Sequence, residues 1–219
     1  MWSKLSLVAF TAGFSMLLYG TFKAFTLPPV ASADICENYR IVFFHVPAAI
    51  SSFVAFTLTF IFSALFLRTE NYRRDLQAVS SARFGFAMIT AALVSGSIWA
   101  KVAWGSYWNW DPRETFVLVL WFAYGAYFAL RTSIEDYSTK ARYSAIYSLF
   151  AFITVPLSYF SAKISVLHPM TSELKFDAER GMLLGIVIFA FILLYVAYFL
   201  VDSKVSEIEE RVVGVNEHE

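Results

Sequence analysis

The sequence has few cysteines, histidines and charges, and each shortage excludes a class of protein. One cysteine, Cys36, among 219 residues excludes an internal disulfide, a Cys-X-X-Cys redox pair and a thiolate zinc cluster. Charged residues make up 16% of the chain, which is too few to cover the surface of a water-soluble domain of this length. The 17 basic and 17 acidic residues balance, so the net charge gives no reason to expect a nucleic acid partner.

Apolar residues dominate instead, at 58% of the chain, and the mean hydropathy is +0.60. A helix that crosses the lipid bilayer needs about 20 largely apolar residues, and several stretches of the sequence meet this requirement. We therefore predict an all-α integral membrane protein, with a bundle of six transmembrane helices over residues 1–203 and a short polar tail at 204–219. The predicted spans are 5–27, 41–67, 84–103, 115–131, 143–162 and 181–201.

The distribution of Lys and Arg predicts how this bundle is oriented. The loops 68–83 and 132–142, with their flanks and the two ends of the chain, carry ten of the 17 basic residues, and the other loops carry seven. Cytoplasmic loops are enriched in Lys and Arg, so we expect both termini in the cytoplasm.

This topology brings two histidines to the outer side of the membrane. His45 lies near the outer end of the second span, His168 lies in the last outer loop, and His218 lies in the tail. An ionisable side chain within a span is a functional candidate, and neutral imidazole is a common axial ligand of haem iron. We therefore predict His45 and His168 as the two axial ligands of a haem. The alternative for His45 is a buried imidazole bonded to a carbonyl, such as the one that Pro47 leaves without its helical partner.

The segment 104–115, between the third and fourth spans, lies on the same side and is rich in tryptophan. Asp111 is a good N-cap, Pro112 suits the first helical position and Glu114 occupies the capping-box position, so the segment ends by starting a helix. Aromatic residues also gather at membrane interfaces, but a belt needs only one lipid-facing stripe. Four large aromatic residues within seven positions favour a platform against a planar ligand, and they are Trp104, Tyr107, Trp108 and Trp110.

Two arginines lie where the propionates of a haem would meet water. Arg40 precedes His45 by five residues, and Arg113 follows the tryptophan-rich segment directly. Arginine binds carboxylates through two parallel hydrogen bonds, so both are predicted to hold propionates. The alternative is that each extends to the membrane interface without a ligand.

Together these residues resemble a known family. The run Trp-Gly-Ser-Tyr-Trp-Asn-Trp-Asp-Pro-Arg-Glu-Thr at 104–115 is similar to the tryptophan-rich WWD signature of the haem-handling proteins CcmC, CcmF and CcsA in cytochrome c biogenesis. Residues 39–50 resemble the start of the second span in the CcmC family, and the Leu-His-Pro loop at 167–169 fits the same family. The Asp-Pro-Arg-Glu-Thr ending is closer to the CcsA and CcmF form, but the length and the histidine count favour CcmC.

The resemblance implies a haem-handling protein of the prokaryotic cytoplasmic (inner) membrane and not an enzyme. A CcmC-like protein presents haem b on the periplasmic side and passes it to the haem chaperone CcmE. It works with the ABC transporter subunits CcmA and CcmB and the small protein CcmD, and the sequence itself contains no Walker A motif. The alternatives are part of a CcsA/CcmF-like cytochrome c haem lyase, a b-type membrane cytochrome, and a haem-free permease or assembly subunit.

Overall fold

The computed structural model describes residues 3–28, 36–165, 167–168 and 176–216, and within them it contains helices and no strand. Six of its helical segments are long and apolar enough to cross a membrane, which confirms the predicted all-α, six-span fold. The elements are α1 (Lys4–Thr26), η1 (Cys36–Ile41), α2 (Val42–Thr69), α3 (Tyr72–Trp104), α4 (Pro112–Ser133), α5 (Tyr137–Ala151), α6 (Thr154–Phe160), η2 (Ser161–Lys163) and α7 (Ala178–Asn216).

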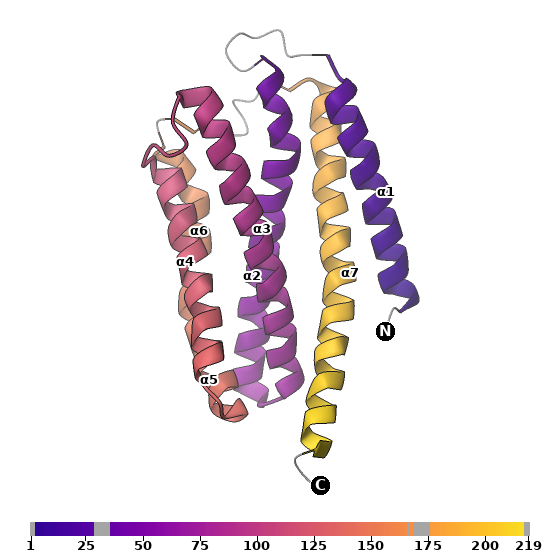
Figure 1. Ribbon diagram of the computed structural model, residues 1–219, viewed down its shortest axis with the longest axis vertical. Helices are drawn as coiled ribbons and strands as arrows, with labels where there is room; N and C mark the ends of the chain where they lie inside the picture. Colours follow the sequence, from indigo (N-terminus) through magenta and orange to yellow (C-terminus); the bar gives the residue numbers. More distant parts are fainter. Residues whose placement is uncertain (1–2, 29–35, 166, 169–175, 217–219) are drawn as a thin grey trace.

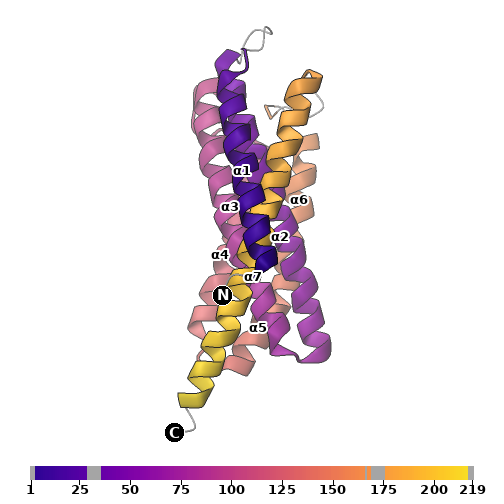
Figure 2. The ribbon, with the colours of Figure 1, turned by 90° about the vertical axis from the view of Figure 1, so that its right-hand side faces the viewer.

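Helices α2 and α3 form the middle of the bundle, with α4, α5 and α6 on one side and α7 and α1 on the other (Figure 1). The outermost helix, α1, packs against α7 and crosses it (Figure 2). The two helices approach closely at Gly20, which has no side chain: a Cβ there would lie 2.5 Å from the Cγ2 atom of Val187. The two ends of the chain point toward the same end of the bundle (Figure 1), and the cytoplasmic placement of that end stays a prediction.

The third span begins much earlier than its hydropathy predicts. The Arg-rich segment 68–83, predicted to be a loop, contains only two residues outside helices, Glu70 and Asn71. Glu70 ends α2 in the left-handed conformation, with a φ of 52°, and the side chain of Asn71 accepts from the backbone N–H of Arg73 to start α3. The predicted loop 132–142 has only three residues outside helices, 134–136, because the side chain of Asp136 caps α5 by accepting from the N–H of Thr139 at 2.7 Å.

A buried ion pair explains why the charged segment joins the helix. Asp75, in the first turn of α3, is only 2% exposed. Arg131 of α4 donates to both of its carboxylate oxygens, at 2.7 and 2.9 Å, and the hydroxyl of Tyr137 donates to it at 3.4 Å. Because the two charges satisfy each other, the helix continues through a segment whose mean hydropathy is too low to predict a span.

The fifth span is divided into α5, α6 and η2, where the sequence predicted one helix. Pro156 has no N–H and its ring opposes the carbonyl of Phe152, so regular α-helical bonding is lost at Phe152 and Ile153. The end of the span is thus a separate short helix, and η2 leads the chain to the start of α4.

The hydrophobic core lies directly beneath one end of the bundle. Phe56 of α2 stacks on Tyr124 of α4 with ring centroids 3.6 Å apart, and both side chains are fully buried. Small residues fill the seam between α2 and α3, where Ala49 and Ala92 pack at the top of this core. The seam is therefore narrow where Ala49 and Ala92 meet.

The Asp75–Arg131 pair gives a testable consequence for stability. Asp75→Ala leaves a buried guanidinium without its partner, and we expect it to destabilise the protein by about 3–5 kcal/mol. Thermal unfolding in detergent measures this change. The matched control is Arg142→Ala, which removes an exposed ion pair with Glu70 at 3.9 Å and is expected to cost about 1 kcal/mol or less. Equal effects of the two substitutions would show that the buried pair does not hold α3 to α4.

Candidate functional site

A cleft opens at the end of the bundle where α2 and α4 begin and α3 ends. About 880 Å³ of space lies between its walls, open solvent included. Its floor is apolar and shares Ala49 and Ala92 with the core. Polar and aromatic side chains converge on it from α2, α3, α4 and the segments before α4 and after η2, and they include His45, Trp99, Trp104, Trp108, Arg113, Glu114 and His168.

His45 stands on the first turns of α2 and is held by α3. Its Nδ1 atom lies 3.0 Å from the carbonyl oxygen of Ala92 and 3.1 Å from the hydroxyl oxygen of Ser95. A carbonyl only accepts, and the Ser95 hydroxyl donates to the carbonyl of Ala91 at 2.7 Å, so Nδ1 carries the proton. Nε2 is then the unprotonated nitrogen, the form in which imidazole binds a metal.

The alternative prediction for His45 is therefore half right. The imidazole is hydrogen-bonded to a carbonyl, but that carbonyl belongs to Ala92 on α3. It is not the carbonyl of Phe43, which Pro47 leaves without its helical partner. Such a bond is what orients a histidine that binds a metal through its other nitrogen. A structural hydrogen bond and a ligand role are compatible here.

Gly96 makes room for the imidazole against α3. A Cβ at this position would lie 2.9 Å from Cε1 of His45 and 3.4 Å from its Nδ1. A distance under 3.0 Å forces a shift, so any side chain at residue 96 would push the ring away from Ala92. The role of Gly96 was not predicted from the sequence, because a glycine inside an apolar span has no signal of its own.

His168 lines the same cleft, although 123 positions separate it from His45 in the sequence. Its ring lies 6.4 Å from that of Trp99, which in turn packs edge to face on Trp104 at 4.8 Å. Trp99 is a cleft residue that the sequence analysis missed, because it was counted only as part of the third span. Its spacing of five residues from Trp104 was the signal available.

The four aromatic residues predicted as one platform are divided by the structure. Trp104 and Trp108 line the cleft, whereas Tyr107 and Trp110 are 60% and 74% exposed and do not. Trp110 has a φ of 56°, a left-handed backbone that is rare for a bulky residue, and its ring packs edge to face on Trp108 at 5.9 Å. The turn at Trp110 is the reason for the division, since it points successive rings in different directions.

The N-terminus of α4 forms as predicted, with one difference. The Asp111 side chain accepts from the N–H of Arg113 at 2.8 Å, and Pro112 occupies the first helical position. Glu114 does not close a capping box, because its Oε2 accepts from the N–H of Asn109 at 2.8 Å instead of from that of Asp111. Glu114 therefore ties down the loop ahead of the helix, and its buried Oε1 has no hydrogen-bond partner among the described residues.

The two predicted arginines lie in different surroundings. Arg113 lines the cleft, and its guanidinium donates to the carbonyls of Ser158 and Tyr159 at 2.6 and 3.1 Å. Arg40 does not line the cleft. Its guanidinium donates to three carbonyls at the C-terminal end of α1, those of Ala24, Phe25 and Leu27.

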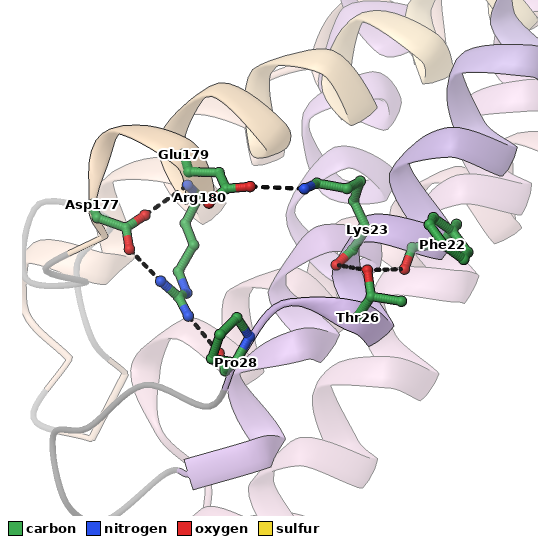
Figure 3. Close-up of polar contacts among 7 residues, drawn as sticks. All are labelled: Phe22, Lys23, Thr26, Pro28, Asp177, Glu179 and Arg180. Atoms are coloured by element: carbon green, nitrogen blue, oxygen red, sulfur yellow. Dashed lines mark hydrogen bonds and ion pairs between the residues drawn. The ribbon is translucent and has the colours of Figure 1, made fainter.

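A second set of charges surrounds the same end of α1 (Figure 3). Lys23 pairs with Glu179 of α7 at 2.8 Å, and Arg180 bridges the side chain of Asp177 and the carbonyl of Pro28. The backbone N–H of Arg180 also donates to Asp177, and this bond lowers the pKa of that carboxyl below its ordinary value. Lys23, Arg40 and Arg180 thus fasten α1 to its neighbours.

Two indole N–H groups also lie among the residues that line the cleft. The Nε1–H groups of Trp99 and Trp108 are buried and lack a hydrogen-bond partner among the described residues. Within the same residues no three His, Cys, Asp or Glu side chains gather into a metal-binding group. Two imidazoles with nearby aromatic edges and N–H donors suit a metal that brings its own planar ligand better than they suit a bare ion.

The sequence is similar to those of proteins of cytochrome c assembly. Residues 1–169 match the family model described as cytochrome C assembly protein. Heme exporter protein C of Rhodobacter capsulatus is 30% identical over 203 residues, which cover 89% of this chain and 83% of the relative. Heme exporter protein C of Bradyrhizobium diazoefficiens is 31% identical over 179 residues, 79% of this chain and 68% of the relative. The cytochrome c biogenesis protein CcsA of Morus indica is 35% identical over 106 residues, but these cover only 45% of this chain and 32% of CcsA.

The close approach at Gly96 gives a prediction for the cleft. Gly96→Ala displaces the His45 imidazole, and we expect haem binding to weaken about tenfold or more, the equivalent of about 1–3 kcal/mol of overpacking. Titration of the purified protein with haem, followed by absorption, measures the change. Gly185→Ala is the control, because a Cβ there meets no atom within 4 Å. Identical affinities for both variants would mean that the position of His45 against α3 is irrelevant to binding.

Proposed function

Since this chain belongs to the cytochrome c assembly protein family and is a multi-pass membrane protein of cytochrome c maturation, we propose that it binds haem b in the cleft between His45 and His168. The haem is held on the periplasmic side of the inner membrane and passed to a CcmE-type haem chaperone. The protein handles haem as a cargo and does not catalyse a reaction on it. Partners of the CcmA, CcmB and CcmD types complete the export complex.

One observation carries this proposal: two histidines from distant parts of the chain line one cleft. Six-coordinate haem iron needs two axial donors, and residues 1–203 contain two histidines, His45 in a span and His168 in a loop. The bond from Nδ1 of His45 to Ala92 leaves Nε2 as the donor atom, and a bond of this kind makes an imidazole a stronger ligand. The relatives named heme exporter protein C support a haem cargo for this chain.

The cleft also offers partners for the haem edge. Arg113 is the cation that lines it, and the indole N–H groups of Trp99 and Trp108 are donors without a protein partner among the described residues. We assign the propionates to these groups. For Arg40, the three carbonyls that it holds favour a role in anchoring α1, and its predicted propionate contact requires the guanidinium to leave them.

Delivery needs part of the site to face the acceptor. Tyr107 and Trp110 are the exposed aromatic residues of the segment between α3 and α4, and the strained turn holds Trp110 outside the cleft. We assign them to contact with the chaperone, while Trp104 and Trp108 contact the haem. The similarity to CcsA over 106 residues favours, as a second candidate, part of a cytochrome c haem lyase, although most of the length of CcsA has no counterpart in the match.

The axial assignment is tested by removing each imidazole in turn. We expect His45→Gly and His168→Gly each to convert the low-spin spectrum of ferric haem to a high-spin one, because a strong-field ligand is lost. Added imidazole restores the low-spin spectrum in each variant. Absorption spectra of the purified proteins record this, with His218→Ala in the tail as the control. Low-spin spectra in both glycine variants without imidazole would disprove the coordination.

The division of the aromatic segment predicts two different defects. Trp108→Ala removes contact area inside the cleft, so we expect less haem per protein after purification. Tyr107→Ala removes a 60% exposed side chain that does not line the cleft, so the haem content stays normal while transfer to the chaperone slows severalfold. The measurement is transfer of bound haem to purified CcmE, with Phe122→Ala on α4, also 60% exposed, as the control. If the haem stays on the wild-type protein in this assay, a b-type cytochrome explains the cleft better than a haem donor.

A further inference from the structure

The carboxylate of Asp111 makes more hydrogen bonds than a helix cap requires. It is 4% exposed and accepts from the N–H of Arg113 in its own helix, which completes the cap. The hydroxyl of Ser165 also donates to it, 2.8 Å from one carboxylate oxygen and 2.7 Å from the other, and the N–H of Leu167 lies 3.4 Å from the second oxygen. The additional donors all come from the segment between η2 and His168.

Ser165 also forms a hydrogen bond with the backbone of His168. Its hydroxyl oxygen accepts from the backbone N–H of His168 at 2.8 Å while its hydrogen points to Asp111. The backbone N–H of Ser165 itself donates to the carbonyl of Ser161 at 3.1 Å, so the residue is fixed from both sides. Asp111, Ser165 and His168 therefore form one continuous chain of hydrogen bonds between the start of α4 and the loop.

A buried carboxylate explains why this chain is well defined. An ionised carboxylate away from water is costly unless several donors satisfy it, and hydrogen bonds to a charged group are stronger than those between neutral groups. Asp111 supplies that charge from the end of a rigid helix. His45 is oriented by α3 through Ala92, whereas His168 lies outside the helices, in the segment after η2.

We propose that Asp111 and Ser165 are positioning residues for His168: the carboxylate holds the Ser165 hydroxyl, and that hydroxyl fixes the backbone of His168 so that its imidazole faces the cleft. The inference rests on the proposed function, because it assigns what sets the second axial ligand. In this role Asp111 acts on His168 through Ser165 and does not contact the haem itself. The opposing explanation is that Asp111 only caps α4.

Ser165→Ala separates these explanations, because it removes the link and leaves the cap to Arg113 intact. We expect the ferric haem complex to take up added imidazole at about tenfold lower concentration than the wild type, since the competing His168 is less well placed. The total haem bound changes little, because His45 is untouched, whereas the thermal stability falls, because the buried carboxylate of Asp111 loses a donor. Ser165→Thr keeps the hydroxyl and is expected to restore the wild-type titration. Ser161→Ala is the matched control, since this buried hydroxyl in the same region donates to the carbonyl of Ser158 and not to Asp111.

Hydrogen–deuterium exchange of the haem-free protein provides a readout that does not depend on coordination. The amide of His168 is expected to exchange about tenfold faster in Ser165→Ala than in the wild type, and at the wild-type rate in Ser161→Ala. If Ser165→Ala does not accumulate, Asp111→Asn tests the same link, because Asn retains the cap but loses the charge, and the His168 amide then exchanges faster than in the wild type.

The outcomes also separate this inference from the proposed function. Wild-type imidazole titration and exchange in Ser165→Ala, together with a high-spin spectrum in His168→Gly, would overturn the positioning role and leave His168 as a ligand. A low-spin spectrum in His168→Gly would overturn both, because there would be no ligand to position. Faster exchange with weakened coordination in Ser165→Ala, corrected by Ser165→Thr, establishes the link.

Discussion

The contact of the His45 imidazole with α3 is the interaction on which the cleft depends. Nδ1 bonds to the carbonyl of Ala92, the ring lies where a side chain on Gly96 would be, and the small residues of the seam let α2 and α3 approach that closely. In a bilayer each buried polar group needs an internal partner, so this bond both stabilises the helix pair and sets which nitrogen remains for a ligand. Stability and function are served by the same contact.

The charged residues at the cleft end of the bundle mainly form hydrogen bonds with the backbone. Arg40 and Arg180 satisfy carbonyls at the end of α1, and Asp111 gathers donors from its own helix and from the loop that carries His168. Helix ends leave several carbonyl and N–H groups unpaired, and near lipid these are costly. In the cleft, the buried indole N–H groups of Trp99 and Trp108 have no hydrogen-bond partner among the described residues.

Hydropathy predicted the six spans, and the chain topology predicted which residues share one end. It did not predict the extension of α3, because the Asp75–Arg131 pair hides two charges that a hydropathy average counts in full. The division of the aromatic segment was also out of reach, since it follows from the left-handed backbone at Trp110. The roles of Gly96 and Ser165 depend on contacts between residues distant in the sequence, and a single sequence carries no signal for them.

A cryo-EM structure of the haem-loaded protein in lipid nanodiscs tests the proposed position of the haem most directly. The account predicts iron between Nε2 of His45 and the imidazole of His168, with Trp104 and Trp108 against the macrocycle and the loop of His168 still bonded through Ser165 to Asp111. Iron bound outside this cleft, or coordinated by neither histidine, would contradict it.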